Sequence, residues 1–261
     1  MNKPPLLWTN VIFFASTALI TLVGVPWYAL THGFDTTQVV LMLLMMGYAG
    51  MSITMGYHRM WSHRTFDAHP AIRFILALGG ALAVQTSAIH WSSDHRIHHL
   101  HVADNDKDPY SAKRGFWFSH MGWMLREYQA ERYEDYTNVK DLQRDPIAAW
   151  QHKHYWTLAW VTNLGFTGIL AVIHGDILGT LLLVGVARLT LSQHVTFFIN
   201  SLAHMYGKRP SSVENTARDN GWIALITYGE GYHNFHHRFA SDYRNGLRWW
   251  QFDPTKWMIR G

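Results

Sequence analysis

The stretch TTQVVLMLLMMGYAGMSITMGYH, residues 36–58, runs from an uncharged apolar segment directly into a histidine. It contains no Asp, Glu, Lys or Arg. A helix needs about 20 mostly apolar residues to cross the hydrocarbon layer of a bilayer. We therefore predict a transmembrane helix over 36–57 that ends at His58. The same criterion predicts three more, so that the complete set of predicted spans is 6–30, 36–57, 154–174 and 177–200.

The positions of the basic residues predict the topology. The links THGFDT and HGD, between the first and second and the third and fourth spans, contain no Lys or Arg. Apart from Arg188, every basic residue lies in the N-terminal tail, in 59–153, or from Lys208 onward. Lys and Arg concentrate on the cytoplasmic side of membranes. Both termini and the segments 58–153 and 201–261 are therefore expected in the cytoplasm, in the inner membrane if the source is bacterial.

This pattern predicts an all-α integral membrane protein of two transmembrane hairpins, with a helical cytoplasmic portion, forming a single domain over 1–261. Arg188, inside the fourth span, is expected to face protein or water rather than lipid. The alternative is a membrane-surface protein whose apolar helices form a buried core.

A fifth apolar run, IRFILALGGALAVQTSAIHW, covers residues 72–91. If the histidines on its two sides meet in one site, the chain between them must cross the membrane an even number of times. We therefore predict that this run is a helix at the interface or inside the cytoplasmic portion, with Gly79-Gly80 as its weak point.

Histidine is abundant, with 18 residues, and cysteine is absent, which excludes thiolate metal sites and disulfides. The histidines gather in GYHRMWSHRTF, SSDHRIHHLH and GYHNFHHRF, and the last two share the form H-x-x-H-H. Positions i, i+3 and i+4 of a helix project from one face. His58 and His63, five residues apart, fit a helix end or a pair serving different metals. An all-nitrogen site suits iron, copper, nickel or zinc.

These segments, together with DKDPYSAKRGFWFSHMGW and ARLTLSQHVTFFINSLAHMYGKRP, resemble the membrane-bound fatty acyl desaturases of the delta-9, stearoyl-CoA type. In its shorter length, ending soon after RNGLRWWQFDPTKWMI, the chain looks more like bacterial and cyanobacterial members than like the animal acyl-CoA enzymes. The resemblance implies a di-iron centre, with O2 as co-substrate. Soluble di-iron bundles bind their metals with several Glu residues, whereas this chain has a single Glu-x-x-His, at Glu230. Glu230 is therefore expected to contact a histidine ligand and not to bind the metal itself. The implied ligands are His58, His63, His95, His98, His99, His204, His233, His236 and His237, with Asn200 acting through water.

Substrate contacts are predicted at six positions. Asp94 either orients a ligand imidazole, contacts the substrate head group, or is a helix N-cap. Lys113 and Arg114 match a basic pair that holds the phosphates of coenzyme A, although exposed basic pairs also face solvent or anionic lipid. The predicted tunnel-mouth residues are Trp91, Gln85 and Phe116. The Met-rich stretch 41–46 packs in the core or lies where a tunnel ends.

The resemblance implies insertion of a cis double bond at C9–C10 of an acyl-CoA or a glycerolipid acyl chain. The carrier stays open, because polar family residues are replaced by Ser93, Thr86 and Phe197. Electrons are expected from a separate ferredoxin, cytochrome b5 or flavoprotein reductase system. The other expected partner is membrane lipid, and no nucleic acid is expected. Two alternatives are a related fatty acyl hydroxylase or conjugase and a His-rich membrane metal transporter.

Overall fold

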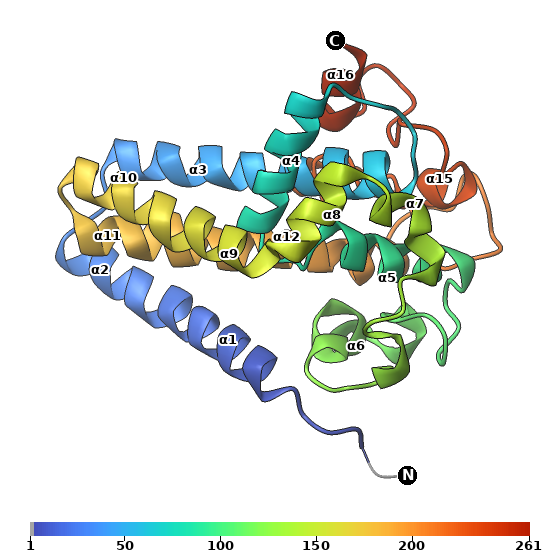
Figure 1. Ribbon diagram of the computed structural model, residues 1–261, viewed down its shortest axis with the longest axis horizontal. Coiled ribbons are helices and arrows are strands. Elements are labelled where there is room, and N and C mark those ends of the chain that lie inside the picture. Colours follow the sequence, from blue (N-terminus) through green and yellow to red (C-terminus); the bar gives the residue numbers. More distant parts are fainter. Residues whose placement is uncertain (1–2) are drawn as a thin grey trace.

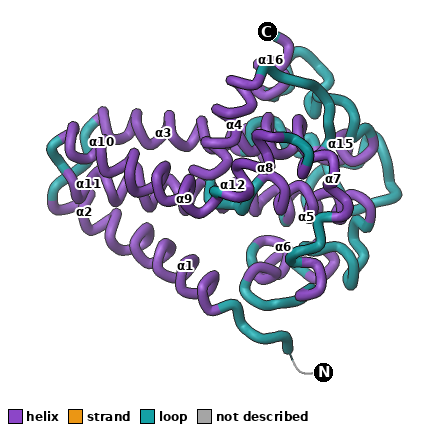
Figure 2. The backbone as a smooth tube through the Cα atoms, in the orientation of Figure 1, coloured by secondary structure: helices purple, strands orange, loops and turns teal. Residues whose placement is uncertain are grey.

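The computed structural model describes residues 3–261, so that the first two residues of the predicted N-terminal tail lie outside the described residues. Helices joined by loops make up this part of the chain, and residues 3–261 contain no strand (Figure 2). Four helices are long and apolar enough to cross a membrane, Trp8–Thr31, Thr36–Ser62, Tyr155–His174 and Ile177–Met205. The prediction of an all-α protein with four spans is confirmed.

Each span is a composite of α-helical and π-helical segments. The first hairpin consists of α1 Trp8–Leu19, η1 Ile20–Gly24, α2 Val25–Thr31, α3 Thr36–Met51 and η2 Ser52–Ser62. The second hairpin consists of α9 Tyr155–Trp160, η7 Val161–Phe166, α10 Thr167–His174, α11 Ile177–Thr180, η8 Leu181–Ala187, α12 Arg188–Asn200 and α13 Leu202–Met205. In Figure 1 the two short links lie together at the left end of the spans.

The second and fourth spans extend further than predicted, to Ser62 and Met205. As a result, His58 and His204 lie on the ends of continuous helices and not in loops.

Polar side chains tie the two hairpins together at these links. The amide of Gln38, which is fully buried, donates to Asp176 Oδ2 at 2.8 Å, and the hydroxyl of Tyr28 donates to Asp176 Oδ1 at 2.7 Å. Asp35 and Gln38 also form a capping box at the start of α3. The pairing of the hairpins is therefore specified by hydrogen bonds as well as by apolar packing.

Arg188 faces protein, as predicted. It is fully buried, and its guanidinium donates to the Leu82 carbonyl at 3.0 Å and to Asn163 Oδ1 at 2.7 Å. The Leu82 carbonyl lies at the end of a helix, where backbone acceptors lack intrahelical partners. Arg188 thus links the two spans of the second hairpin to the adjoining helix.

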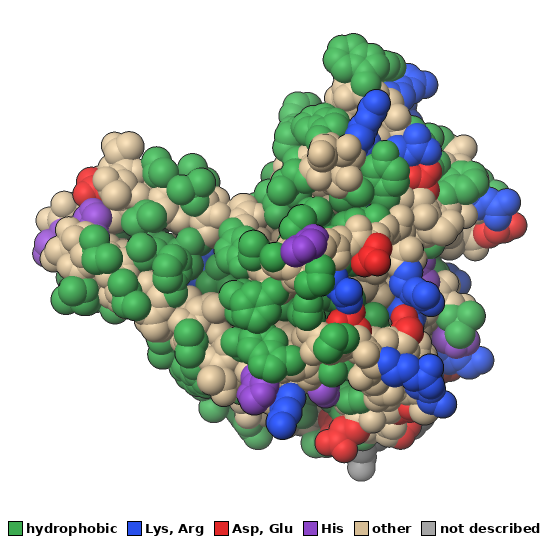
Figure 3. Space-filling model, turned by 45° about the horizontal axis from the view of Figure 1, so that its top comes forward, with side chains coloured by type: hydrophobic (Ala, Val, Ile, Leu, Met, Phe, Trp, Pro, Cys, Tyr) green, Lys and Arg blue, Asp and Glu red, His purple; other side chains and the backbone are tan. Residues whose placement is uncertain are grey.

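The remaining helices form a head at the opposite end of the spans, which we define as residues 63–154 and 206–261. Most of the Lys and Arg visible in Figure 3 lie on the head, whereas the far end of the spans shows hydrophobic side chains together with His, acidic and other residues. The chain ends near the head in Figure 1. The head contains α4 Pro70–Leu82, α5 Ala88–Leu100, η3 Ala112–Arg114, α6 Phe116–His120, η4 Gly122–Met124, η5 Ala130–Arg132, η6 Thr137–Val139, α7 Lys140–Gln143, α8 Pro146–Lys153, α14 Gly221–Ile226, α15 His233–Arg238 and α16 Pro254–Arg260.

As predicted, the apolar run 72–91 does not form a fifth span. The prediction that its helix is weakest at Gly79-Gly80 is wrong. It divides into α4 and α5 at residues 83–87, where Ser87 caps α5 by accepting from the His90 backbone N–H at 3.2 Å. Gly79 and Gly80 remain helical and buried. A Cβ at Gly79 would overlap Ser52, and one at Gly80 would overlap Tyr57. The two glycines therefore allow close packing of α4 on the second span.

Candidate metal centre

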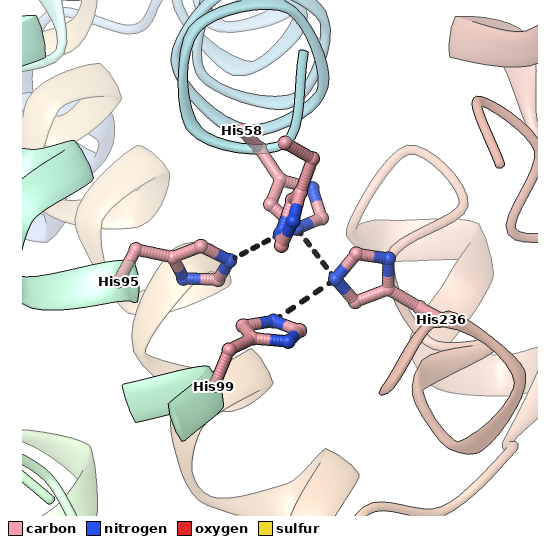
Figure 4. A group of neighbouring side chains, drawn as sticks. His58, His95, His99 and His236 are labelled. Atoms are coloured by element: carbon pink, nitrogen blue, oxygen red, sulfur yellow. Dashed lines mark hydrogen bonds between the residues drawn. The ribbon is translucent and has the colours of Figure 1, made fainter. Parts of the chain in front are cut away.

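All nine predicted histidine ligands converge where the spans meet the head. They form two neighbouring groups, within each of which one nitrogen per ring lies within 4.8 Å of those of the others. Figure 4 shows four rings of the larger group directed toward a common point from three separate parts of the chain. The five-histidine group is His58, His63, His95, His99 and His236, and the four-histidine group is His98, His204, His233 and His237.

A π-helix accounts for the spacing of the first pair. The η2 segment ends with a hydrogen bond from the His63 backbone N–H to the His58 carbonyl, at 3.1 Å, which spans five residues. In a π-helix, residues five apart lie on the same side, whereas in an α-helix they would diverge. His58 and His63 therefore enter the same group, so that the alternative of two different metals for this pair does not fit the geometry.

The two H-x-x-H-H triplets divide in complementary ways. On α5, the first and last members, His95 and His99, enter the five-histidine group, and the middle member His98 enters the other. On α15 the roles are exchanged, because His233 and His237 enter the four-histidine group and His236 joins the larger one. Residues i and i+4 thus contribute to one group while residue i+3 contributes to the other.

The nitrogen positions fit bound metal ions. Neighbouring Nε2 atoms are 2.8 Å apart for His63 and His95, 2.9 Å for His58 and His236, and 3.1 Å for His204 and His233. Two nitrogens at right angles, each about 2.1 Å from one metal ion, would be separated by about 3 Å. The buried Nε2 of His98 has no hydrogen-bond partner in the described structure, as a metal-directed nitrogen requires. Each group can therefore surround one ion.

The protonation states also favour metal binding. Burial, followed by the neighbouring imidazoles, holds the pKa values of these rings well below the usual histidine value. Neutral imidazole is the form that binds metals. Outside the spans, the histidines with a lowered pKa are His63, His95, His99, His233, His236 and His237.

Glu230 contacts His58, one of the predicted ligands. Its Oε2 is 2.8 Å from His58 Nδ1 and 2.7 Å from the donating amide of Asn245, and its Oε1 accepts from the Arg59 guanidinium at 3.0 Å. Burial raises the pKa of Glu230, but His58 and Arg59 outweigh this effect and the net pKa is below the usual value. An ionised Glu230 orients His58 so that Nε2 faces the centre of its group.

Asp108 has the corresponding place behind the four-histidine group, and the sequence analysis missed it. Its Oδ1 lies 2.9 Å from His98 Nδ1, and its carboxylate also accepts from the backbone N–H groups of Ala103 and Tyr110. The available signal was the acidic segment DNDKDPY, residues 104–110, shortly after the second histidine cluster. Three acidic residues occur close together there, and only the fold distinguishes them.

A cavity runs from the metal centre between the second and fourth spans. Its lining is mostly apolar and includes His58, His98 and His233 at one end and Met46 and Gly50 farther along the second span. Asn200 lines the same cavity near two members of the four-histidine group, a position compatible with its predicted role through water.

The six predicted substrate residues fall into different environments. Gln85 and Trp91 line the cavity, with Gln85 donating to Thr196 at 2.9 Å. Lys113, Arg114 and Phe116 are exposed on the head and are not among the residues that line this cavity in the described chain.

Asp94 does not match two of its predicted roles. Its carboxylate is 3.6 Å from His90 Nε2, and within residues 3–261 it makes no hydrogen bond to any of the nine histidines. It also lies in the middle of α5, whose N-cap is Ser87, so that the N-cap alternative is wrong. Contact with the substrate head group stays a prediction.

Comparison with known proteins identifies the family. The fatty acid desaturase family model matches residues 35–261. The chain belongs to the fatty acid desaturase family. It is 40% identical over 97% of its length to a probable acyl-CoA desaturase of Schizosaccharomyces pombe and 36% identical over 99% to an sn-2 palmitoyl-lipid 9-desaturase of Nostoc, of which it covers 88%. The chain spans about half the length of two yeast relatives, 52% of the Schizosaccharomyces pombe protein and 49% of acyl-CoA desaturase 1 of Saccharomyces cerevisiae.

Proposed function

We propose that this membrane protein is a fatty acyl delta-9 desaturase with two iron ions, one in each histidine group. The observation that carries the proposal is the pair of all-imidazole groups at the end of an apolar cavity. Iron bound there would supply the oxidising power needed to remove hydrogen from an unactivated alkyl chain with reduction of O2. Asn200 completes the four-histidine group through a water molecule.

The chain's own residues bind and position the substrate. The mostly apolar cavity accommodates the acyl chain and excludes water, and the distance along the cavity determines which carbons lie beside the metal centre. Trp91 stacks on His95, with ring centroids 4.7 Å apart, and forms the wall at the metal end. Asp94, Lys113, Arg114 and Phe116 lie on the head side and are proposed to contact the head group of an acyl-CoA or a glycerolipid.

The decisive experiment is expression in a host that lacks its own delta-9 desaturase, followed by lipid analysis to locate any new double bond. We expect a cis double bond at C9–C10 and its loss in His236→Ala. A hydroxylated product would replace the proposed reaction with a hydroxylase reaction, and an unchanged product from His236→Ala would contradict the site assignment.

Metal analysis of the same protein distinguishes an enzyme from a transporter. We expect two iron ions per chain. Transporters place ionisable residues along a path at mid-membrane, whereas these histidines gather at one end of the spans. Zinc that exchanges freely without turnover would favour transport.

The proposed topology places both termini and the metal centre in the cytoplasm, in the inner membrane of a bacterium. The chain has no cysteine, so that single cysteines can be introduced without background labelling. Thr37 at the links and Val213 on the head are both exposed. A membrane-impermeant maleimide should label Thr37→Cys on intact cells and Val213→Cys only after permeabilisation. The opposite pattern would contradict this topology.

An external electron donor completes the proposed reaction, supplied by a ferredoxin, cytochrome b5 or flavoprotein reductase system. The basic head favours an acidic carrier, because complementary charge accelerates association. Steady-state rates with such a donor should fall as ionic strength rises. A rate that does not depend on salt would exclude electrostatic steering.

A further inference from the structure

The far end of the cavity is formed in part by Tyr228, a residue with no part in the metal centre. We propose that the ring of Tyr228 closes the acyl cavity and limits the length of the chain that can be desaturated. This inference rests on the proposed function, because it takes the cavity as the acyl-binding site.

The residues of the second span that Tyr228 contacts show where its ring lies along the cavity. The lining residues His58, Thr54, Gly50 and Met46 follow one face of this helix away from the metal centre. Met46 is twelve residues before His58, which corresponds to about 18 Å along a helix. Tyr228 meets the helix at Gly50 and Met46, and therefore at the end of the cavity remote from the metal centre.

The ring packs directly on the backbone of the second span. The Tyr228 hydroxyl donates to the Met46 carbonyl at 3.3 Å. A Cβ placed on Gly50 would overlap the Tyr228 ring, with its Cζ at 2.8 Å. Glycine at this position therefore leaves a gap that the aromatic ring fills, so that the wall at this point is supplied by Tyr228.

The backbone of Tyr228 is held in a strained conformation. Its φ is 54°, in the left-handed region, where a bulky residue is an outlier. Such strain persists only when the surroundings enforce it. Here Thr255 donates to the Tyr228 carbonyl at 3.2 Å, and the following Gly229 N–H donates to the Ala224 carbonyl at 2.9 Å.

The same loop connects the two ends of the cavity. Two residues after Tyr228, Glu230 contacts His58 and Arg59 at the metal end. The depth of the Tyr228 ring is thereby fixed relative to the metal centre. A rigid wall at a fixed distance from the reacting carbons selects chain length. The part of the acyl chain beyond these carbons must fit in the space between the metal centre and the Tyr228 ring.

The test compares Tyr228→Ala with Tyr228→Phe in the desaturase-deficient host, supplied with saturated acids from myristic to arachidic. Ala bears the same backbone strain as Tyr but removes the ring, whereas Phe retains the ring and loses only the hydroxyl. We expect Tyr228→Ala to raise the ratio of longer to shorter unsaturated products by about tenfold, the discrimination that a methylene or two in an apolar pocket provides. Tyr228→Phe should retain the wild-type preference.

A binding measurement makes the test independent of turnover. Purified wild-type and variant proteins are compared by thermal unfolding in detergent with each saturated fatty acid added. We expect the most stabilising acid to be longer for Tyr228→Ala, and Tyr228→Leu serves the same purpose if the Ala variant does not fold. Tyr206→Ala, on an exposed tyrosine, is the surface control.

The possible results separate this inference from the proposed function. Desaturation with the same length profile in wild type and Tyr228→Ala would overturn the role of Tyr228 and leave the desaturase proposal standing. If wild type forms no unsaturated product, the proposed function fails, and the binding profiles decide the role of Tyr228. Identical binding profiles for wild type and the Ala or Leu variant would overturn it.

Discussion

Replacing Glu230 by Gln tests whether the carboxylate behind His58 controls metal affinity. Four nitrogens that can act as donors lie close to this carboxylate: Arg59 Nε and Nη2, Asn245 Nδ2 and, at 2.8 Å, His58 Nδ1. A glutamine amide offers one oxygen and one NH2 group. Whichever way the amide is turned, its NH2 group faces two of the four donors. The substitution therefore removes the Glu230 acceptor from two of these buried nitrogens while preserving the shape of the side chain.

The magnitude follows from the partners that remain. An unsatisfied buried donor costs about 1–3 kcal/mol. Arg59 keeps Asp253 at 2.9 Å and the Tyr243 carbonyl at 2.6 Å, which reduces its part of the cost. Loss of the partner of a metal-bound histidine lowers metal affinity by about 10–100-fold. We therefore expect Glu230→Gln to lose about 2–4 kcal/mol of stability and at least about tenfold in metal retention.

The assay is metal content per chain after dialysis against increasing chelator, measured together with the thermal midpoint in detergent. Glu214→Gln is the matched control, because Glu214 is an exposed glutamate of the head. Wild-type metal retention in a folded Glu230→Gln protein would refute the argument that Glu230 orients His58.

Three further predictions concern Asp108, Gln38 and His120. Asp108→Asn weakens the hydrogen bond to His98 and should lower metal retention of the four-histidine group about tenfold, seen as early loss of one metal ion per chain on dialysis. Gln38→Ala removes the amide that donates to Asp176 and should destabilise the protein by about 1–3 kcal/mol, measured by denaturation in detergent. Burial and then His194 lower the pKa of His120 from 6.5 to about 4, so the unfolded chain binds more protons in this interval. Stability should therefore fall as the pH falls from 6.5 toward 4, and His120→Gln should reduce this fall in the midpoint measured against pH.

Exposed neighbours provide the controls for these three predictions: Asp106→Asn, Thr37→Ala and His154→Gln. Equal loss of both metal ions in Asp108→Asn would contradict its assignment to one group. An unchanged midpoint in Gln38→Ala would show that the hydrogen bond between Gln38 and Asp176 does not help to join the hairpins. An unaltered pH profile in His120→Gln would mean that other groups cause the acid destabilisation.

Much of the architecture could be predicted because its determinants act along the chain. Span length, the absence of charge and the distribution of Lys and Arg are local properties, and they identified the four spans. The run 72–91 was kept out of the count by a different argument, the requirement that the histidine clusters on its two sides meet in one site. The structure brings the nine histidines of these clusters together, as this requirement predicts.

The division of the histidines could not be read from their spacing. His98 and His99 are adjacent but belong to different groups. The group that each histidine enters depends on how α5 faces α15, which the spacing does not reveal. The π-helix that brings His58 and His63 into one group lies in a fully buried part of the second span and has no distinct sequence signal. Gly79 was misread for a similar reason, as glycine both weakens a helix and permits close contact.

The distribution of the nine histidines has a consequence for biosynthesis. The ligands run from His58 to His237, and each group needs at least one from α15. The five-histidine group is complete only when the chain has been made as far as His236, and the four-histidine group only at His237, after all four spans have been synthesised. A chain interrupted before α15 would retain four of the five imidazoles of one group and only two of the four of the other. Binding of metal by both complete groups would therefore be a late step, which follows synthesis of the whole membrane portion.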